Sequence, residues 1–164
     1  MNASRNDRAG PRPVLLLLSG PNLGLLGERQ PEIYGAATLA DHVERAERAA
    51  TRAGLELKHL QSEHEADLVT AVHDARGSVD AIVVNAGALS HSSWALHDAL
   101  AAFDGVVVEL HLSNPDAREP WRRQSVVAPV ADGTVAGFGG LGYELAVEAA
   151  ARLVAGRAGT SPGA

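Results

Sequence analysis

The sequence predicts an α/β fold in which five parallel strands form one sheet with helices on both faces. Short apolar runs, typical of strands buried on both faces, alternate with longer segments whose apolar residues recur at helical spacing. Capping residues precede several helical segments, and glycines follow them. With 164 residues, the chain has the length of one domain.

The first predicted strand is the apolar run at residues 14–18, and a loop rich in Gly, Pro and Asn follows it up to residue 35. Thr38 is the expected N-cap of the first helix, with Asp41 at capping-box spacing, and Gly54 ends this helix. Residues 55–61 form the second strand. Ser62 and Glu65 repeat the capping-box spacing before a helix that Gly77 ends.

The alternation continues, with strands expected at residues 81–84, 106–110 and 134–138 and helices at about 92–102 and 141–154. Residues 115–124 are expected to be irregular or shortly helical. In the helix at 92–102, the expected core residues are Ala95, Leu96, Ala99 and Phe103. Right-handed crossovers favour a doubly wound, flavodoxin-like three-layer sandwich.

Composition limits the possible partners and compartment. Residues 1–13 and 156–164 are expected to be disordered tails around a single domain at 14–155. Without cysteine, disulfides and thiolate chemistry are excluded. The net charge of −6 argues against nucleic-acid or anionic-membrane partners. The longest apolar run is far shorter than the about 20 residues of a membrane span, so we expect a cytoplasmic protein.

Ligands of doubly wound folds bind beyond the carboxyl ends of the strands, so the segments after each strand are the candidate site. The loop at 19–35 lacks the Lys-Ser/Thr ending of a phosphate-binding loop, and its length suggests a lid or binding loop. Asn22 could stabilise charge on an oxygen, and Arg29 and Tyr34 follow it. Alternatively, Asn22 is only a turn residue and the other two are surface residues.

A polar segment that includes Asn85 and His91 follows the third strand, at the start of a helix where N–H groups favour anions. These residues could equally be turn and cap residues only. A metal site on His91, His97 and Asp98 is disfavoured, because the six-residue spacing places the two imidazoles on different helix faces.

A charged residue and a histidine interrupt the apolar fourth strand. Glu109 and His111 are two residues apart, so their side chains share a face. A buried carboxylate beside an imidazole orients the ring and favours its protonated form. The alternative is a satisfied buried pair without a catalytic role. Ser113 and Asn114 add hydrogen-bonding groups directly after the strand.

Arginines cluster further along the chain, at Arg118, Arg122 and Arg123. Arg118 and Arg122 share a face if this stretch is helical, and arginine suits bidentate recognition of carboxylates. A solvated surface is the alternative interpretation.

The glycines at 137, 139 and 142 spell G-x-G-x-x-G, the dinucleotide-binding pattern. Only 22 residues follow, without a further strand to carry the ribose-binding acid, so close packing of helix on strand is the better explanation.

The motifs G-P-N-L-G, the downstream Arg29 and Tyr34, N-A-G-A-L-S-H-S-S and E-L-H-L-S-N occur in this order, and with them the chain resembles the type II 3-dehydroquinate dehydratases over residues 14–154. The resemblance implies anti elimination of water from 3-dehydroquinate to 3-dehydroshikimate through an enolate. It places the chain in the shikimate pathway of aromatic amino-acid biosynthesis or in quinate catabolism. It also implies no metal or cofactor, and a homododecamer built from trimers.

Residue by residue, the resemblance implies that Tyr34 is the base, Arg29 supports it, Asn22 stabilises the enolate and His111 is the acid. It assigns substrate binding to Asn85, His91, Leu112, Ser113 and Arg122. Asp98 falls on an acid that reaches a neighbouring subunit's site. Serines at 90 and 92 stand where threonine is frequent in the family, which keeps the hydroxyls.

The chemistry sets requirements on these residues. Tyrosine ordinarily has a pKa of about 10, so a tyrosine base needs roughly 4 kcal/mol of preference for the phenolate, which a nearby guanidinium such as Arg29 could supply. Tyr143, the other tyrosine, is expected in the core or an interface. Lys58, the only lysine, lies mid-strand, which disfavours an imine mechanism.

The sequence disfavours two other classes of protein. A non-catalytic flavodoxin-like binding or regulatory module would carry an acidic cluster or a phosphate loop at the strand ends, where this chain has Ser19 and Asn85. A serine hydrolase using Ser113 would need a G-x-S-x-G elbow, which is missing.

Overall fold

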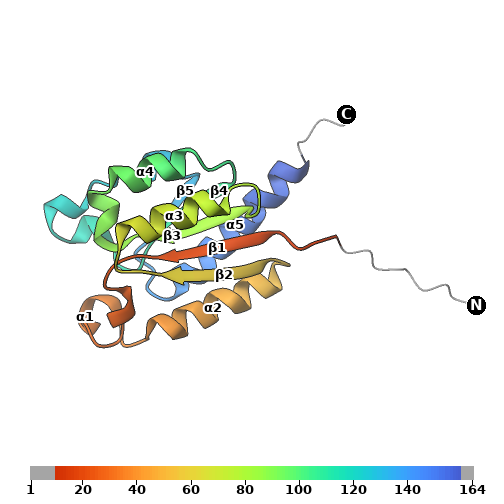
Figure 1. Ribbon diagram of the computed structural model, residues 1–164. Coiled ribbons are helices and arrows are strands. Elements are labelled where there is room, and N and C mark those ends of the chain that lie inside the picture. Colours follow the sequence, from red (N-terminus) through yellow and green to blue (C-terminus); the bar gives the residue numbers. More distant parts are fainter. Residues whose placement is uncertain (1–9, 160–164) are drawn as a thin grey trace, which may run out of the picture.

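The computed structural model describes residues 10–159, and a five-stranded parallel sheet forms its centre (Figure 1). The strand order is β2-β1-β3-β4-β5, which confirms the predicted flavodoxin-like fold. The strands are β1 Val14–Ser19, β2 Glu56–Gln61, β3 Ala81–Asn85, β4 Val106–His111 and β5 Gly133–Ala136. The predicted tail segments 1–9 and 160–164 lie outside the described residues.

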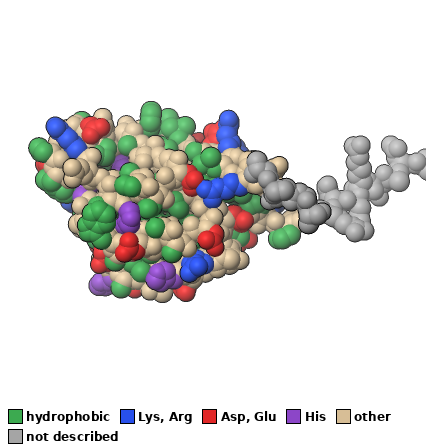
Figure 2. All heavy atoms as spheres, turned by 90° about the horizontal axis from the view of Figure 1, so that it is seen from above, with side chains coloured by type: hydrophobic (Ala, Val, Ile, Leu, Met, Phe, Trp, Pro, Cys, Tyr) green, Lys and Arg blue, Asp and Glu red, His purple; other side chains and the backbone are tan. Residues whose placement is uncertain are grey.

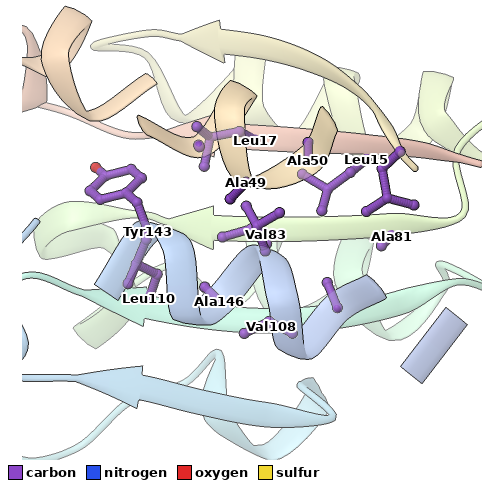
Figure 3. Packing of buried hydrophobic residues seen from close by; sticks show 14 of the residues in the cluster. Leu15, Leu17, Ala49, Ala50, Ala81, Val83, Val108, Leu110, Tyr143 and Ala146 are labelled. Atoms are coloured by element: carbon purple, nitrogen blue, oxygen red, sulfur yellow. The ribbon is translucent and has the colours of Figure 1, made fainter. Parts of the chain in front are cut away.

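Helices cover both faces of this sheet. Helices α2 Leu39–Arg52 and α5 Leu141–Gly159 pack on one face, and α3 Glu65–Ala75 and α4 Trp94–Ala101 on the other (Figure 1). Successive residues of β1 alternate between the two cores, as strand geometry requires. Figure 3 shows the core under α2 and α5, where Tyr143 packs among aliphatic side chains, so its predicted core position is confirmed.

The capping box before α2 is present as predicted. The Thr38 hydroxyl accepts from the Asp41 N–H at 3.2 Å, and the Asp41 carboxylate accepts from the Thr38 N–H at 2.8 Å. The second predicted box is wrong, because His64 is the N-cap of α3. Ser62 instead donates to the Asp67 carboxylate at 2.5 Å and accepts from the His64 N–H.

Several predicted boundaries differ from the structure. The loop at 19–35 contains a 3-10 turn at Leu23–Leu25 and the short helix α1 Pro31–Tyr34. Strand β5 ends at Ala136 rather than at residue 138, because Gly137 turns the backbone with a φ of 89°. Helix α5 continues to Gly159 through part of the predicted tail, where the Arg157 guanidinium pairs with the Asp132 carboxylate at 2.6 Å.

Helix α4 also departs in detail from its prediction. Leu96, Ala99 and Phe103 are buried as expected, whereas Ala95 is exposed and Leu100 takes the inward position. Position 100 lies four residues after Leu96, which keeps both on one helix face.

The glycine-rich turn before α5 serves packing. A Cβ on Gly142 would come within 3.1 Å of the Leu110 side chain, and one on Gly137 within 3.2 Å of the Asn114 Cβ. These approaches support the packing interpretation of the G-x-G-x-x-G pattern.

The surface seen in Figure 2 carries acidic and basic side chains interspersed with hydrophobic ones. Within residues 10–159, every helix is too short or too polar to cross a membrane.

A buried histidine lies in the core between α2 and α5. His42 is 2% exposed, and its ring stacks on the Tyr143 ring at 4.9 Å between centroids. Neither ring nitrogen has a hydrogen-bond partner among the described residues. Burial, and next the nearby Arg45 guanidinium, lower the pKa of His42 from its ordinary value. The folded protein therefore holds this imidazole neutral.

We expect His42→Leu to raise the free energy of unfolding by about 1 kcal/mol at pH 7.5, because a buried polar group without a partner is removed. The stability gain of His42→Leu over the wild type should grow below a pH of about 6.5. In the wild type, the unfolded chain binds a proton on His42 in this range, whereas the folded chain keeps the ring neutral. Urea unfolding at pH 7.5 and 5.5 measures both effects. The control is His73→Leu at an exposed position. A loss of stability in His42→Leu, or an unchanged pH dependence, would contradict the account.

Candidate active site

A pocket opens at the carboxyl edge of the sheet, and nearly all the predicted site residues line it. The segment after β1 contributes Asn22, Arg29 and Tyr34. The ends of β3 and β4 and the residues after them complete the wall with Asn85, His91, His111, Leu112, Ser113 and Arg122. Asp98 does not line the pocket and is exposed on α4.

The sheet topology explains why these residues meet. Strand β3 lies between β1 and β4, and all three run parallel, so their carboxyl ends share one edge. The backbone N–H of Gly20 donates to the Asn85 carbonyl at 2.8 Å, which ties the segment after β1 to the end of β3. A Cβ at position 20 would lie 2.5 Å from the Ala86 carbonyl oxygen, so only glycine fits.

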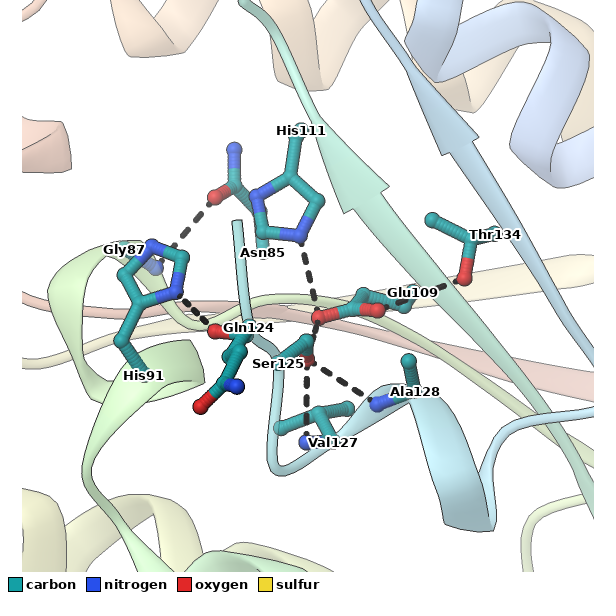
Figure 4. A network of polar contacts seen from close by, with 10 residues as sticks. All are labelled: Asn85, Gly87, His91, Glu109, His111, Gln124, Ser125, Val127, Ala128 and Thr134. Atoms are coloured by element: carbon teal, nitrogen blue, oxygen red, sulfur yellow. Dashed lines mark hydrogen bonds and ion pairs between the residues drawn. The ribbon is translucent and has the colours of Figure 1, made fainter. Parts of the chain in front are cut away.

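The pair predicted on the fourth strand is present. His111 Nε2 lies 3.0 Å from Glu109 Oε1, and Glu109 is 1% exposed (Figure 4). Burial raises the pKa of Glu109, but hydrogen bonds from His111 and Ser125 outweigh this effect, and the net pKa is below its ordinary value. Glu109 is therefore a carboxylate that accepts from Nε2, and Nδ1 is the His111 nitrogen left for a ligand.

A second histidine stands beside the first in the pocket wall. The His91 and His111 rings are stacked with centroids 6.2 Å apart. His91 Nδ1 lies 2.7 Å from the Gln124 carbonyl oxygen. Because a carbonyl only accepts, Nδ1 carries a proton, and in the corresponding tautomer Nε2 is the acceptor.

Asn85 connects the pocket with the core. Its Nδ2 lies 3.5 Å from the Tyr143 hydroxyl, and its Oδ1 accepts from the Gly87 N–H at 3.4 Å. Burial raises the pKa of Tyr143 to about 12, so this phenol stays protonated. Of the two tyrosines in the chain, Tyr34 is the one that lines the pocket.

Arg118 lines the pocket, and the sequence offered it only as a member of a basic cluster that could recognise a carboxylate. Its guanidinium carbon lies 5.1 Å from the centroid of the Tyr34 ring, and Nη1 donates to the Ser113 hydroxyl at 3.2 Å. The Arg118 side chain is 13% exposed, whereas Arg29 lies exposed at the rim of the same pocket. No sequence spacing links position 118 to position 34, so only the tertiary fold could identify this contact.

Arg122 is fixed from two sides. Its Nε donates to the Glu119 carboxylate at 2.8 Å, and its guanidinium carbon lies 4.0 Å from the Trp121 ring centroid. The Trp121 ring also meets His91 edge-on at 5.5 Å. These contacts orient two side chains of the pocket wall, of which Arg122 could donate to oxygen atoms of a ligand and His91 could accept from its hydroxyls.

Within the described part of the chain, no cluster of three or more His, Cys, Asp or Glu side chains is arranged to hold a metal ion. The donors and acceptors of the pocket are amides, hydroxyls, imidazoles and guanidinium groups. This set suits a small polyhydroxylated carboxylate.

Comparison with known proteins identifies the family. Residues 13–151 match the model of the family described as dehydroquinase class II. A 3-dehydroquinate dehydratase of Bacillus licheniformis is 50% identical over 135 residues, which cover 82% of this chain and 93% of that protein. A catabolic 3-dehydroquinase of Phaeosphaeria nodorum is 48% identical over 85% of this chain and 92% of its own length.

Solved structures agree with the sequence comparison. A type II dehydroquinase from Propionibacterium acnes superimposes with a TM-score of 0.81 at 39% identity, covering 85% of this chain and 96% of its own. The type II dehydroquinase from Butyrivibrio crossotus gives a TM-score of 0.83 at 34% identity, over 85% of this chain and 98% of that one. The chain belongs to the class II dehydroquinase family.

Proposed function

We propose that this pocket eliminates water from 3-dehydroquinate to give 3-dehydroshikimate, with Tyr34 as the base and His111 as the acid. Family membership makes the chain a dehydratase, that is, a hydro-lyase. The observation that carries the mechanism is the pairing, in one pocket, of a tyrosine beside a guanidinium with a histidine backed by a carboxylate. These two groups meet the needs of a reaction that removes one proton and delivers another.

The base removes the proton from the carbon next to the substrate ketone. A phenolate is required, and a cation in a partly desolvated site favours it. Arg118 supports this role, because its guanidinium lies 5.1 Å from the Tyr34 ring centroid and is shielded from water. Arg29 lines the same pocket and adds positive charge, although its exposure lets water screen that charge. We assign the stabilisation of the phenolate to both arginines.

The enolate formed by this step needs a hydrogen-bond donor at the ketone oxygen. Asn22 holds a left-handed conformation with a φ of 66°, and its backbone N–H donates to the Glu63 carboxylate at 2.8 Å. These features fix the residue at the pocket rim. We assign the Asn22 side-chain amide to the enolate oxygen.

The acid then protonates the leaving hydroxyl. Glu109 engages His111 Nε2 at 3.0 Å and stabilises the imidazolium, so Nδ1 delivers the proton. Substrate binding falls to the surrounding polar groups. We assign the carboxylate of the substrate to Ser113 and the backbone at Leu112, and its hydroxyls to Asn85, His91 and Arg122. No step calls for a metal ion or an organic cofactor.

The test mixes the purified chain with 3-dehydroquinate and follows the absorbance of the conjugated enone in the product. We expect turnover without added metal and an undiminished rate after treatment with EDTA. Absence of the enone band would reject the proposed activity. Loss of turnover on chelation, with recovery on adding a metal ion, would reject the metal-free mechanism.

We further propose that the chain assembles as a homododecamer of trimers in which Asp98 serves a neighbouring site. Asp98 is exposed on α4 and lies outside its own pocket. Closed homo-oligomers of this kind place one surface of each subunit against the next.

Subunit complementation tests this assembly. We expect Asp98→Ala and Tyr34→Phe chains to have little activity separately and to regain part of it when co-expressed, because mixed oligomers hold some sites with both residues intact. Light scattering of the wild type should give a mass near twelve chains. A fully active monomer, or mixed oligomers without any recovery, would contradict the proposal.

A further inference from the structure

We propose that Ser125 and Thr134 are positioning residues that hold Glu109 as a carboxylate aligned on His111. The proposal deepens the proposed function, on which it rests for the role of His111. Neither residue lines the pocket, so any effect on the reaction passes through Glu109. Figure 4 shows the two hydroxyls directed at the Glu109 carboxylate from different segments.

The contacts of Ser125 fix the direction of its proton. Its hydroxyl oxygen accepts from the backbone N–H groups of Val127 and Ala128, each at 3.0 Å. With both lone pairs occupied, the hydroxyl can only donate, and its acceptor is Glu109 Oε1 at 2.5 Å. This is the oxygen that also accepts from His111 Nε2. An oxygen with two donors directed at it has no room for a proton of its own.

Thr134 holds the other carboxylate oxygen. It is the register partner of Glu109 on the neighbouring strand β5, and its hydroxyl lies 3.3 Å from Oε2. The carboxylate is therefore held at both oxygens while the side chain is 1% exposed. Burial without donors would favour the neutral acid, so the hydroxyls offset the cost of keeping the charge.

The neighbourhood of Glu109 contains one charged partner and several neutral groups. His111 on β4 is the group whose charge acts on it directly, and on the other side β3 presents the apolar register partner Val84. The hydroxyls come from β5 and from the segment before residue 128. Beyond His111, the titratable or charged side chains around the pocket are Arg29, Tyr34, His91, Arg118 and Arg122.

Removing either hydroxyl should make Glu109 easier to protonate. A donor to a carboxylate lowers its pKa, so the loss of a donor raises the pKa of Glu109. We expect a rise of about one pH unit in the protonation midpoint of the Glu109 carboxyl for Ser125→Ala. Thr134→Val should give a smaller rise, because its hydrogen bond is longer. KM at neutral pH should change little.

The experiment follows the protonation of Glu109 by carbon-13 NMR of its side-chain carboxyl, and measures kcat and KM at neutral pH, for the wild type, Ser125→Ala and Thr134→Val. Ser125→Thr and Thr134→Ser keep a hydroxyl and should keep the wild-type midpoint. Thr70→Val, at an exposed position of α3, is the matched control. Ser125→Ala also removes an acceptor for two backbone N–H groups and could unfold the segment. Thr134 is exposed on the edge strand β5, so Thr134→Val should leave the fold intact. It therefore tests the proposal even if Ser125→Ala does not fold.

The NMR measurement separates this proposal from the proposed function. Carbon-13 NMR of the Glu109 side-chain carboxyl follows its protonation without any turnover, and its midpoint should rise in both variants. A rise in a protein that lacks dehydratase activity would reject the function and retain the positioning role. Folded variants in which Glu109 keeps the wild-type midpoint would overturn the proposal.

Discussion

Replacing Tyr34 with Phe is expected to lower kcat by at least about 10²- to 10⁴-fold, the usual cost of removing a general base. The substitution removes only the hydroxyl. Tyr34 is half-buried at the end of α1, and its ring packs against the core under α2 and α5, a contact that phenylalanine keeps. The fold and substrate binding should therefore persist while proton removal fails.

The matched control for this prediction is Tyr143→Phe. That change removes a hydroxyl from the core rather than from the pocket, and burial keeps the Tyr143 phenol protonated. We expect a much smaller loss of kcat from it. Steady-state kinetics and circular dichroism on both variants make the comparison. Near-normal turnover by Tyr34→Phe would show that another group removes the proton.

His111→Ala is expected to produce the second large effect and to separate the two proton transfers. Without the imidazole, the leaving hydroxyl has no acid, so product formation should fall by about 10²- to 10⁴-fold. Tyr34 is untouched, so the enolate can still form and revert. The variant should therefore exchange the hydrogen next to the substrate ketone with solvent while making little product.

Proton NMR of 3-dehydroquinate in D₂O measures this exchange. The control is His73→Ala, an exposed histidine on α3 far from the chemistry, which should behave as the wild type. Exchange that disappears together with product formation would mean that His111 acts in the first step as well. Product formation at the wild-type rate would remove His111 from the mechanism.

Strongly local signals made the fold predictable from the sequence. The five predicted strands and the capping box at Thr38 and Asp41 depend on patterns among neighbours in the chain, and both are confirmed. The predictions that are wrong lie where tertiary contacts decide. Ser62 fits a capping box by spacing, yet its hydroxyl bonds to Asp67. The end of α5 lies beyond its predicted position, where the distant Asp132 pairs with Arg157.

The site was predictable where it follows the strand ends. The position of His111 beside Glu109 follows from their two-residue spacing, and the parallel sheet brings Asn22 and Asn85 to the same edge. Contacts between distant positions could not be predicted. The sequence offered Arg118 as a carboxylate-binding candidate but gave no sign of its contact with Tyr34, and Thr134 meets Glu109 only through strand pairing. The individual roles given to the predicted site residues stay predictions.

The central claim is an anti elimination in which Tyr34 removes the hydrogen opposite to the leaving hydroxyl. The direct measurement uses 3-dehydroquinate carrying deuterium only at that hydrogen position, with mass spectrometry of the product. The account predicts 3-dehydroshikimate without deuterium, a slower reaction than with unlabelled substrate when proton removal limits the rate, and almost no product from Tyr34→Phe. Product that keeps its deuterium would mean a syn elimination and would contradict the mechanism proposed for this pocket.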